Sequence, residues 1–190
     1  MVKMMRTMLA MLLIVAWLMP TPILADSYSS LWKQLDRAAS KDQPKTELAI
    51  LKKIAHKATT ERAYGHLLKA QIQAVSVRQS LSPDSLRPSV IRLEGEQLKA
   101  EKAGNKVLAA VYAAVLGRAY DQFPKLCEDA ADAEATSKQW YDKSLRHPDA
   151  LAKAFATGYE PFVIDGVDSR IFGDDLLHII GFQAGRTQFL

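Results

Sequence analysis

The sequence predicts an all-α protein, built of antiparallel helical hairpins in a repeat-like, tetratricopeptide-like array of about seven helices. Three observations lead to this prediction. Apolar residues recur at steps of three and four along almost the whole chain, which is the spacing of one face of an α-helix. The connections between these segments are short, so successive helices are expected to lie antiparallel. A pair of helices takes about 34 residues, the tetratricopeptide period, although the Trp-Leu-Gly-Tyr pattern of that repeat does not recur cleanly.

Length and composition agree with one folded domain. The chain has 190 residues, of which 48% are hydrophobic and 24% charged. Such a chain is long enough to bury a core, and its composition excludes disordered, collagen-like and disulfide-stapled proteins. The one cysteine, Cys127, cannot form an internal disulfide. We interpret it as a buried structural thiol; the alternative is a nucleophile, which its acidic neighbours disfavour because they oppose thiolate formation.

The first 25 residues have the pattern of a signal peptide. Lys3 and Arg6 precede the apolar run MLAMLLIVAWLM, which is short for a membrane span, and Pro20 ends that run. Ala25 offers the small residue that a signal peptidase needs, so we predict an exported domain of residues 26–190; a retained N-terminal anchor is the alternative. We expect a periplasmic or envelope-associated protein without a stable membrane span. Loss of two positive charges lowers the formal charge from +4 to +2, which argues against a nucleic-acid partner.

Three helical segments are expected in the first half of the mature chain. The first spans residues 26–40 with Asp26 or Ser27 as its N-cap, the second spans 41–60 with a proline in its first turn, and the third spans 61–79. Each segment carries an apolar stripe at helical spacing. The stripes are Tyr28, Leu31, Trp32, Leu35 and Ala39; Leu48, Leu51, Ile54, Ala55 and Ala58; and Tyr64, Leu67, Leu68, Ile72 and Val75.

The connector SLSPDSLRPSV, rich in serine and proline, separates these helices from the next two. Pro88 is expected to open a helix over residues 88–103, which Gly104 closes. The segment 105–123 is the least polar helix of the mature chain. Its alanines and Gly117 allow neighbouring helices to approach closely, so we predict that it is the central helix of the core.

The last third of the chain is less regular. We expect a polar helix over residues 127–147, a short helix from Pro148 to Gly158, an extended segment near 159–172 and a closing helix over 174–185. Four acids gather at the start of the polar helix, with the spacing of a solvated helix face. These acids are Glu128, Asp129, Asp132 and Glu134.

The stretch DGVDSRIFGDDLLH, from Asp165 to His178, is the strongest candidate for a chemical site because it holds four aspartates and a histidine. Its acids do not have the spacing of a calcium-binding loop, and hydrophobic residues stand where ligands would be needed. The pattern is better explained as a turn followed by a helix start. In that interpretation Asp174 is the N-cap and Asp175 lies near the positive end of the helix dipole.

The sequence contains no common motif for catalysis or metal binding. It lacks G-x-S-x-G, a glycine-rich phosphate loop and C-x-x-C, and its histidines form no zinc-type pair. His66, at the edge of an apolar stripe, is expected to be a hydrogen-bonded structural histidine. The other histidines are His56, His147 and His178. We therefore predict a non-enzymatic interaction domain with no catalytic, cofactor-binding or metal-binding residues and no cofactor.

An ordered series of segments resembles a known family. SYSSLWKQLDRAASKDQPKTELAILKKIAHKA, YGHLLKAQIQ, SPDSLRPSVIRLE, VLAAVYAAVLGRAY and EPFVIDGVDSRIFGDDLLHIIGFQAG are similar to the N-terminal helical region of Bacteroidetes-type bacterial alpha-2-macroglobulin-like proteins. The resemblance spans nearly the whole mature chain. It implies a secreted protease inhibitor, many times longer than this chain, that continues into β-sandwich domains and traps proteases. This chain is then expected to be a fragment that holds the helical head.

No trapping residue of that family can be carried over to this sequence. The thioester signature is cysteine, glycine, glutamate and glutamine in order, whereas Cys127 is followed by Glu128 and Asp129, and no bait segment is recognisable. The predicted partner is a protein, either the downstream macroglobulin domains or a protease. The alternative is a free-standing, repeat-like periplasmic module that binds proteins, and an enzyme is a distant third.

Overall fold

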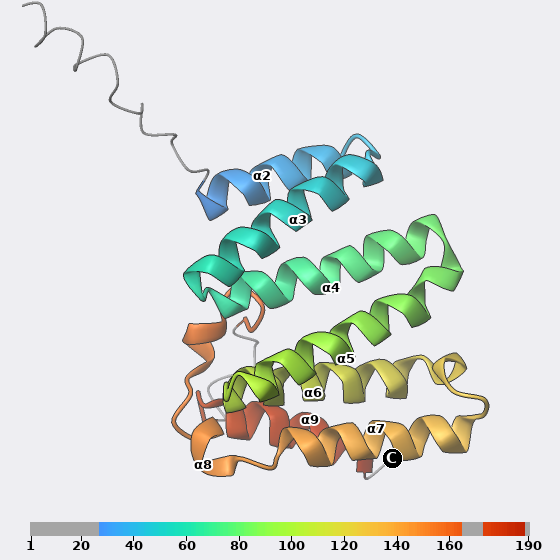
Figure 1. The fold of residues 1–190 in the computed structure, drawn as a ribbon, viewed down its shortest axis with the longest axis vertical. Helices are drawn as coiled ribbons and strands as arrows, with labels where there is room; N and C mark the ends of the chain where they lie inside the picture. Colours follow the sequence, from blue (N-terminus) through green and yellow to red (C-terminus); the bar gives the residue numbers. More distant parts are fainter. Residues whose placement is uncertain (1–26, 165–172, 189–190) are drawn as a thin grey trace, which may run out of the picture.

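The computed structural model describes residues 27–164 and 173–188, and these residues form an all-α structure, as the sequence predicts (Figure 1). The predicted signal peptide lies outside them. The part of the chain that is described contains eight helices and no strand. The helices are α2 (Tyr28–Ala39), α3 (Pro44–Glu61), α4 (Tyr64–Leu81), α5 (Leu86–Lys102), α6 (Lys106–Gln122), α7 (Ala130–Ser144), α8 (Pro148–Leu151) and α9 (Leu176–Gln188).

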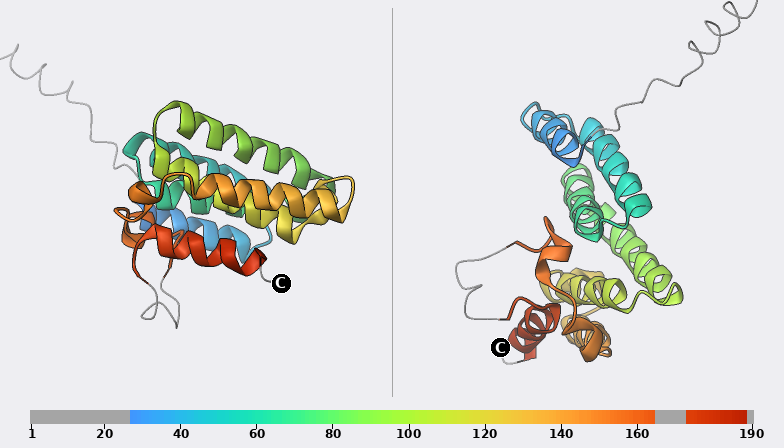
Figure 2. Two further views of the ribbon diagram at one scale, coloured as in Figure 1. Left: turned by 90° about the horizontal axis from the view of Figure 1, so that it is seen from below. Right: turned by 90° about the vertical axis from the view of Figure 1, so that its left-hand side faces the viewer.

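Successive long helices run antiparallel through the molecule. Helices α2 to α5 follow one another in a row, and α6, α7 and α9 form a compact group at the far end of that row (Figures 1 and 2). Short 3-10 turns at Pro83–Ser85 and Pro124–Leu126 lie between α4 and α5 and between α6 and α7. The tetratricopeptide-like character of the array stays a prediction.

Local sequence signals explain where several helices begin and end. The side chains of Ser27, Asn105 and Asp129 accept hydrogen bonds from backbone N–H groups in the first turns of α2, α6 and α7, at 3.2, 3.1 and 2.8 Å. Such caps satisfy donors that a helix leaves unpaired. Gly104, with φ of 73°, follows α5 in the left-handed conformation that glycine adopts without a steric penalty. Helix α5 begins at Leu86, two residues before the predicted start, since proline is tolerated within a first turn.

Two separate hydrophobic cores hold the helices together, and α4 contributes to both. The first core joins α2, α3 and one face of α4, whereas the second joins the opposite face of α4 to α5, α6, α8 and α9. The buried side chains of the first core are Leu31, Leu35, Ala38, Ile50, Leu51, Ile54, Ala70 and Ala74. The second core is larger, and Leu68, Val90, Tyr112, Leu116, Leu151 and Leu176 are its most deeply buried members.

Helix α6 is the central helix of the second core, as predicted. Nine of its residues are buried, and it packs against both α5 and α7. Gly117 allows the close approach to α7, because a Cβ at this position would lie 2.9 Å from the ring of Tyr141. The hydroxyl of Ser137 also donates a hydrogen bond of 2.8 Å to the Gly117 carbonyl. The small residues of this helix therefore shape the core around it.

The helix predicted from Pro148 to Gly158 is wrong beyond its first turn. Helix α8 ends at Leu151, and a 3-10 turn covers Ala156–Tyr159. Between them the backbone pairs with the segment before α9, where the Ala156 N–H donates to the Asp174 carbonyl at 2.8 Å and the Leu176 N–H donates to the Ala154 carbonyl at 2.8 Å. These bonds to a distant segment replace helical bonds. Of the predicted extended segment, residues 165–172 lie outside the described part of the chain.

A cluster of aromatic and charged side chains holds α2 against α3 and α4. The indole N–H of Trp32 donates a 2.9 Å hydrogen bond to Nδ1 of His66, and the Tyr28 ring stacks on the imidazole with 3.8 Å between ring centroids. The Tyr28 hydroxyl donates to Glu61 at 2.8 Å, and Lys57 pairs with the same carboxylate at 2.6 Å. The prediction that His66 is a hydrogen-bonded structural histidine is confirmed.

This cluster requires a neutral His66, because an indole N–H can only donate and Nδ1 must therefore be unprotonated. Burial lowers the pKa of His66, and the nearby positive charge of Lys69 lowers it further, against an opposing effect of Glu61. Lys69 itself lies over the Trp32 ring, 4.9 Å from its centroid. The neutral form is thus favoured in the folded state.

We expect the protein to lose stability as the pH falls below about 6.5, the ordinary pKa of histidine. Between that value and the lowered pKa of folded His66, the unfolded chain binds more protons than the folded chain, so unfolding becomes easier with acidification. The free energy of unfolding, measured with urea between pH 5 and 8, should depend less on pH in His66→Gln than in the wild type. The matched control is His56→Gln on the exposed face of α3. Equal pH profiles for wild type and His66→Gln would contradict this account.

A second prediction concerns Gly65 in the first turn of α4. A Cβ at Gly65 would overlap the backbone of Tyr159 and Glu160, whereas a Cβ at Gly95 in α5 would have nothing within 4 Å. Gly65→Ala is expected to destabilise the protein by about 1–3 kcal/mol, because backbone must move to admit the methyl group. Gly95→Ala should instead stabilise it by up to about 1 kcal/mol through helix propensity. Urea unfolding of both variants checks this, and an unchanged Gly65→Ala variant would show that the close contact is absent.

Candidate functional site: a cationic cleft between three helices

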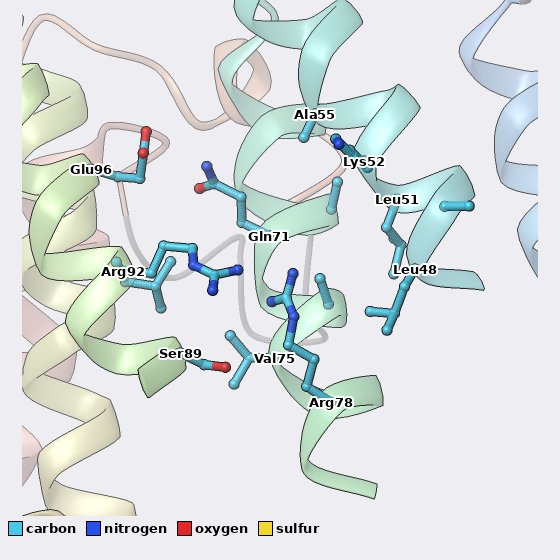
Figure 3. Close-up of a pocket in the computed structure, with 14 residues that line it drawn as sticks. Leu48, Leu51, Lys52, Ala55, Gln71, Val75, Arg78, Ser89, Arg92 and Glu96 are labelled. Carbon is cyan, nitrogen blue, oxygen red and sulfur yellow. The ribbon is translucent and has the colours of Figure 1, made fainter. Parts of the chain in front are cut away.

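A cleft of about 540 Å³ opens between α3, α4 and α5, and we refer to it as the cationic cleft (Figure 3). It lies where the two hydrophobic cores meet, since residues of the first core on α3 and α4 and Leu93 of the second core line it. Cavities that bind ligands commonly have volumes of about 300–1,000 Å³. The lining residues are Leu48, Ala49, Leu51, Lys52, Ala55, Ala70, Gln71, Ala74, Val75, Arg78, Ser89, Arg92, Leu93 and Glu96.

Helical spacing brings these side chains to the cleft. On α4, Ala70, Ala74 and Arg78 stand at successive steps of four, so they follow one face of the helix. The short side chains of the two alanines leave space open for the cleft, and the longer side chain of Arg78 also lines it. On α5, Arg92 and Glu96 are four residues apart and face the same space.

Positive charge prevails in the cleft. Lys52, Arg78 and Arg92 carry three positive charges, and Glu96 carries the one negative charge among the lining residues, so the net formal charge of the lining is +2. The Glu96 carboxylate pairs with Lys99 on its own helix at 2.6 Å. It points away from the guanidinium of Arg92 in Figure 3.

The two guanidinium groups face one another across the cleft in Figure 3. Burial lowers the pKa of Arg78, and the positive charge of Arg92 lowers it further. Both effects disfavour the charged form of Arg78, yet an arginine keeps its proton at any ordinary pH. The folded protein therefore holds two repelling cations at this place.

Gln71 adds a polar group to the wall of the cleft. Its Oε1 atom accepts a 2.6 Å hydrogen bond from the hydroxyl of Tyr112, which is only 1% exposed. This bond orients the side-chain amide and leaves its NH₂ group to donate. The cleft thus combines cationic and amide donors with an aliphatic floor.

A second cavity lies on the other side of α4 and α5. It has a volume of about 550 Å³ and is lined mainly by aliphatic and aromatic side chains of α4, α5, α6, α9 and residues 162–164. Val75 and Leu93 line both cavities, so these two side chains lie between them. Arg118 is the one charged residue of its lining among the described residues.

The stretch that the sequence singled out does not contribute to the cleft. Asp165 to Phe172 fall outside the described residues, and Asp175, not Asp174, caps α9. Its Oδ1 atom accepts from the His178 backbone N–H at 3.0 Å, and its Oδ2 atom lies 2.7 Å from Nδ1 of the same histidine. The backbone hydrogen bond from His178 lowers the pKa of Asp175. The predicted cap is displaced by one residue because the Asp174 carbonyl takes part in the pairing with Ala156.

The other residues considered from sequence are scattered over the surface. Cys127 is half-buried, whereas the sequence predicted a buried thiol, because the residue ends a 3-10 turn at the edge of α7. Its Sγ lies 3.9 Å from the Thr136 hydroxyl. His56 and His147 are exposed. The four acids near the start of α7 are exposed, as the sequence predicts: Glu128, Asp129, Asp132 and Glu134.

The described residues hold no group of three or more His, Cys, Asp or Glu side chains that could bind a metal ion. None of the helices in this part of the chain has the length and apolar character needed to cross a membrane.

Sequence reasoning did not find Lys52, Arg78 and Arg92. The sequence does show one unusual feature, because Arg78 lies at the same helical spacing as Ala70 and Ala74 and thus interrupts an apolar face. What the sequence does not reveal is which face of α5 turns toward α4. The convergence of the two arginines depends on that orientation.

Comparison with known proteins finds no relative of this chain. No family model matches the chain, and neither a curated protein nor a solved structure matches it. The resemblance to alpha-2-macroglobulin-like proteins stays a prediction.

The repulsion between the two arginines makes a prediction about stability. Arg92→Gln is expected to raise the free energy of unfolding by roughly 0.2–1 kcal/mol at low ionic strength, the size of an ordinary interaction between partly exposed charges. The gain should vanish near 1 M salt, where the Debye length is only about 3 Å. Urea unfolding at several salt concentrations measures it, with Lys53→Gln on the exposed face of α3 as the control. A loss of stability in Arg92→Gln would show that Arg92 makes a favourable contact in the folded chain.

Proposed function

We propose that this chain is a non-catalytic, exported helical interaction domain that binds a protein partner in its cationic cleft. The observation that carries the proposal is the cleft itself, in which an aliphatic floor lies beside Lys52, Arg78 and Arg92. Apolar contact area combined with a few placed charges is what a recognition site needs. The floor supplies the burial of apolar surface, and the charges select the partner.

The resemblance to alpha-2-macroglobulin-like proteins supports one version of this function. In that version the domain is the helical head of a larger protease inhibitor, and its partner is a downstream β-sandwich domain or a protease. In the alternative version the domain acts alone as a periplasmic binding module. The DNA beyond the codon for Leu190 distinguishes the two, because only the first version requires that it encode β-rich domains.

Photo-crosslinking tests the binding function directly. A benzophenone amino acid at Ala49, which lines the cleft and is exposed, should form a crosslink to a discrete protein partner in cells that naturally make this protein. The same probe at Lys53, which is exposed on α3 but does not line the cleft, serves as the control. Mass spectrometry of the crosslinked band identifies the partner. Equal crosslinking from both positions, or none from Ala49, would contradict a binding role for the cleft.

A further inference from the structure

The charge of the cleft identifies the kind of group that it binds. Some charged side chains elsewhere in the described structure pair with an opposite charge, as Lys143 does with Glu101 at 2.8 Å and Lys57 with Glu61 at 2.6 Å. Arg78 and Arg92 instead have each other as neighbours, and the nearest acid of the lining, Glu96, is engaged by Lys99. An anion between the two guanidinium groups would attract both of them, and these two attractions would offset the repulsion between the arginines.

Guanidinium groups also define the shape of that anion. Each presents a planar set of N–H donors that matches the two oxygens of a carboxylate or the oxygens of a phosphate. Gln71 offers a further N–H donor from the wall, since its carbonyl oxygen already accepts from Tyr112. A carboxylate placed between α4 and α5 would therefore meet donors from both helices.

The rest of the cleft favours a ligand larger than a small ion. A water molecule occupies about 30 Å³, so a space of about 540 Å³ has room for several side chains. Its floor consists of aliphatic groups, which gain nothing from a hydrated ion but gain from an apolar neighbour. The aliphatic lining residues are Leu48, Ala49, Leu51, Ala55, Ala70, Ala74, Val75 and Leu93.

We propose that the cationic cleft binds a short peptide segment of a protein partner in which an aspartate or glutamate stands beside aliphatic residues. The carboxylate lies between Arg78 and Arg92, and Lys52 on α3 adds long-range attraction at the rim. The aliphatic side chains of the segment pack on the floor between α3 and α4. This inference rests on the proposed function, because it specifies the chemistry of the partner segment that the cleft takes.

Selection from a display library tests the inference before the partner protein is identified. Random twelve-residue peptides are selected on the purified full-length chain and, in parallel, on the double variant Arg78→Gln/Arg92→Gln. The wild type is expected to enrich peptides in which acidic residues adjoin Leu, Ile or Val, and the double variant is expected to lose this enrichment. Circular dichroism and urea unfolding establish that the variant is folded.

The best selected peptide is then measured by fluorescence anisotropy. Arg78→Gln and Arg92→Gln should each weaken its binding by about tenfold or more, the usual effect of losing a hydrogen bond to a charged group. Lys53→Gln should leave binding unchanged. Replacement of the peptide's acids by their amides should weaken binding to the wild type as much as the arginine variants do, and rising NaCl concentration should weaken it progressively.

Three results would overturn the inference. The first is enrichment of peptides without acidic residues, and the second is equal binding of the acidic and amide peptides. The third is binding of inorganic phosphate at the arginine pair with no selectable peptide, which would make the cleft a site for small anions. If crosslinking from Ala49 still captures a partner in any of these cases, the proposed function stands and only the acidic chemistry fails.

Discussion

The packing of α4 against two different hydrophobic cores is the constraint on which the rest of the architecture depends. Ala70 and Ala74 on one face of this helix belong to the core shared with α2 and α3, whereas Leu68 belongs to the core around α6. Helix α5 packs primarily with α6 and belongs to the second core alone. The space bounded by α3, α4 and α5 is therefore closed by neither core, and the cationic cleft occupies it.

Several charged side chains in this structure tie neighbouring helices together. Lys143 links α7 to α5 through contacts of 2.8 Å with Glu101 and 3.0 Å with Gln97, and Tyr120 donates to Glu94 to link α6 to α5 at 2.7 Å. Such pairs satisfy both partners and tie neighbouring helices. The arginines of the cleft have no such arrangement. Proteins tolerate unfavourable electrostatics at sites that bind a ligand. The cationic cleft is for this reason the best candidate for a functional site.

The first core is small, and polar contacts around His66 add to it. Three residues of α2 are buried, and the aromatic cluster around His66 supplements them with two hydrogen bonds, a stacked ring and an ion pair at Glu61. The second core is instead built on α6, whose nine buried residues contact helices on several sides. Since α3 forms one wall of the cleft and also carries α2, the polar cluster helps to hold that wall in place.

Local patterns in the sequence are sufficient for the all-α class, for most helix limits and for the central position of α6. They also predict a cap at Asp26 or Ser27, of which the structure shows Ser27, the end of α5 at Gly104 and the structural role of His66, because caps, glycine conformations and apolar stripes act within a few residues. The early end of α8 and the cap at Asp175 needed the structure, since both follow from hydrogen bonds between segments about twenty residues apart. The meeting of Arg78 with Arg92 depended on tertiary structure most of all. Periodicity places each arginine on a face of its helix, but the relative rotation of α4 and α5 follows from the packing of both cores, which no local pattern encodes.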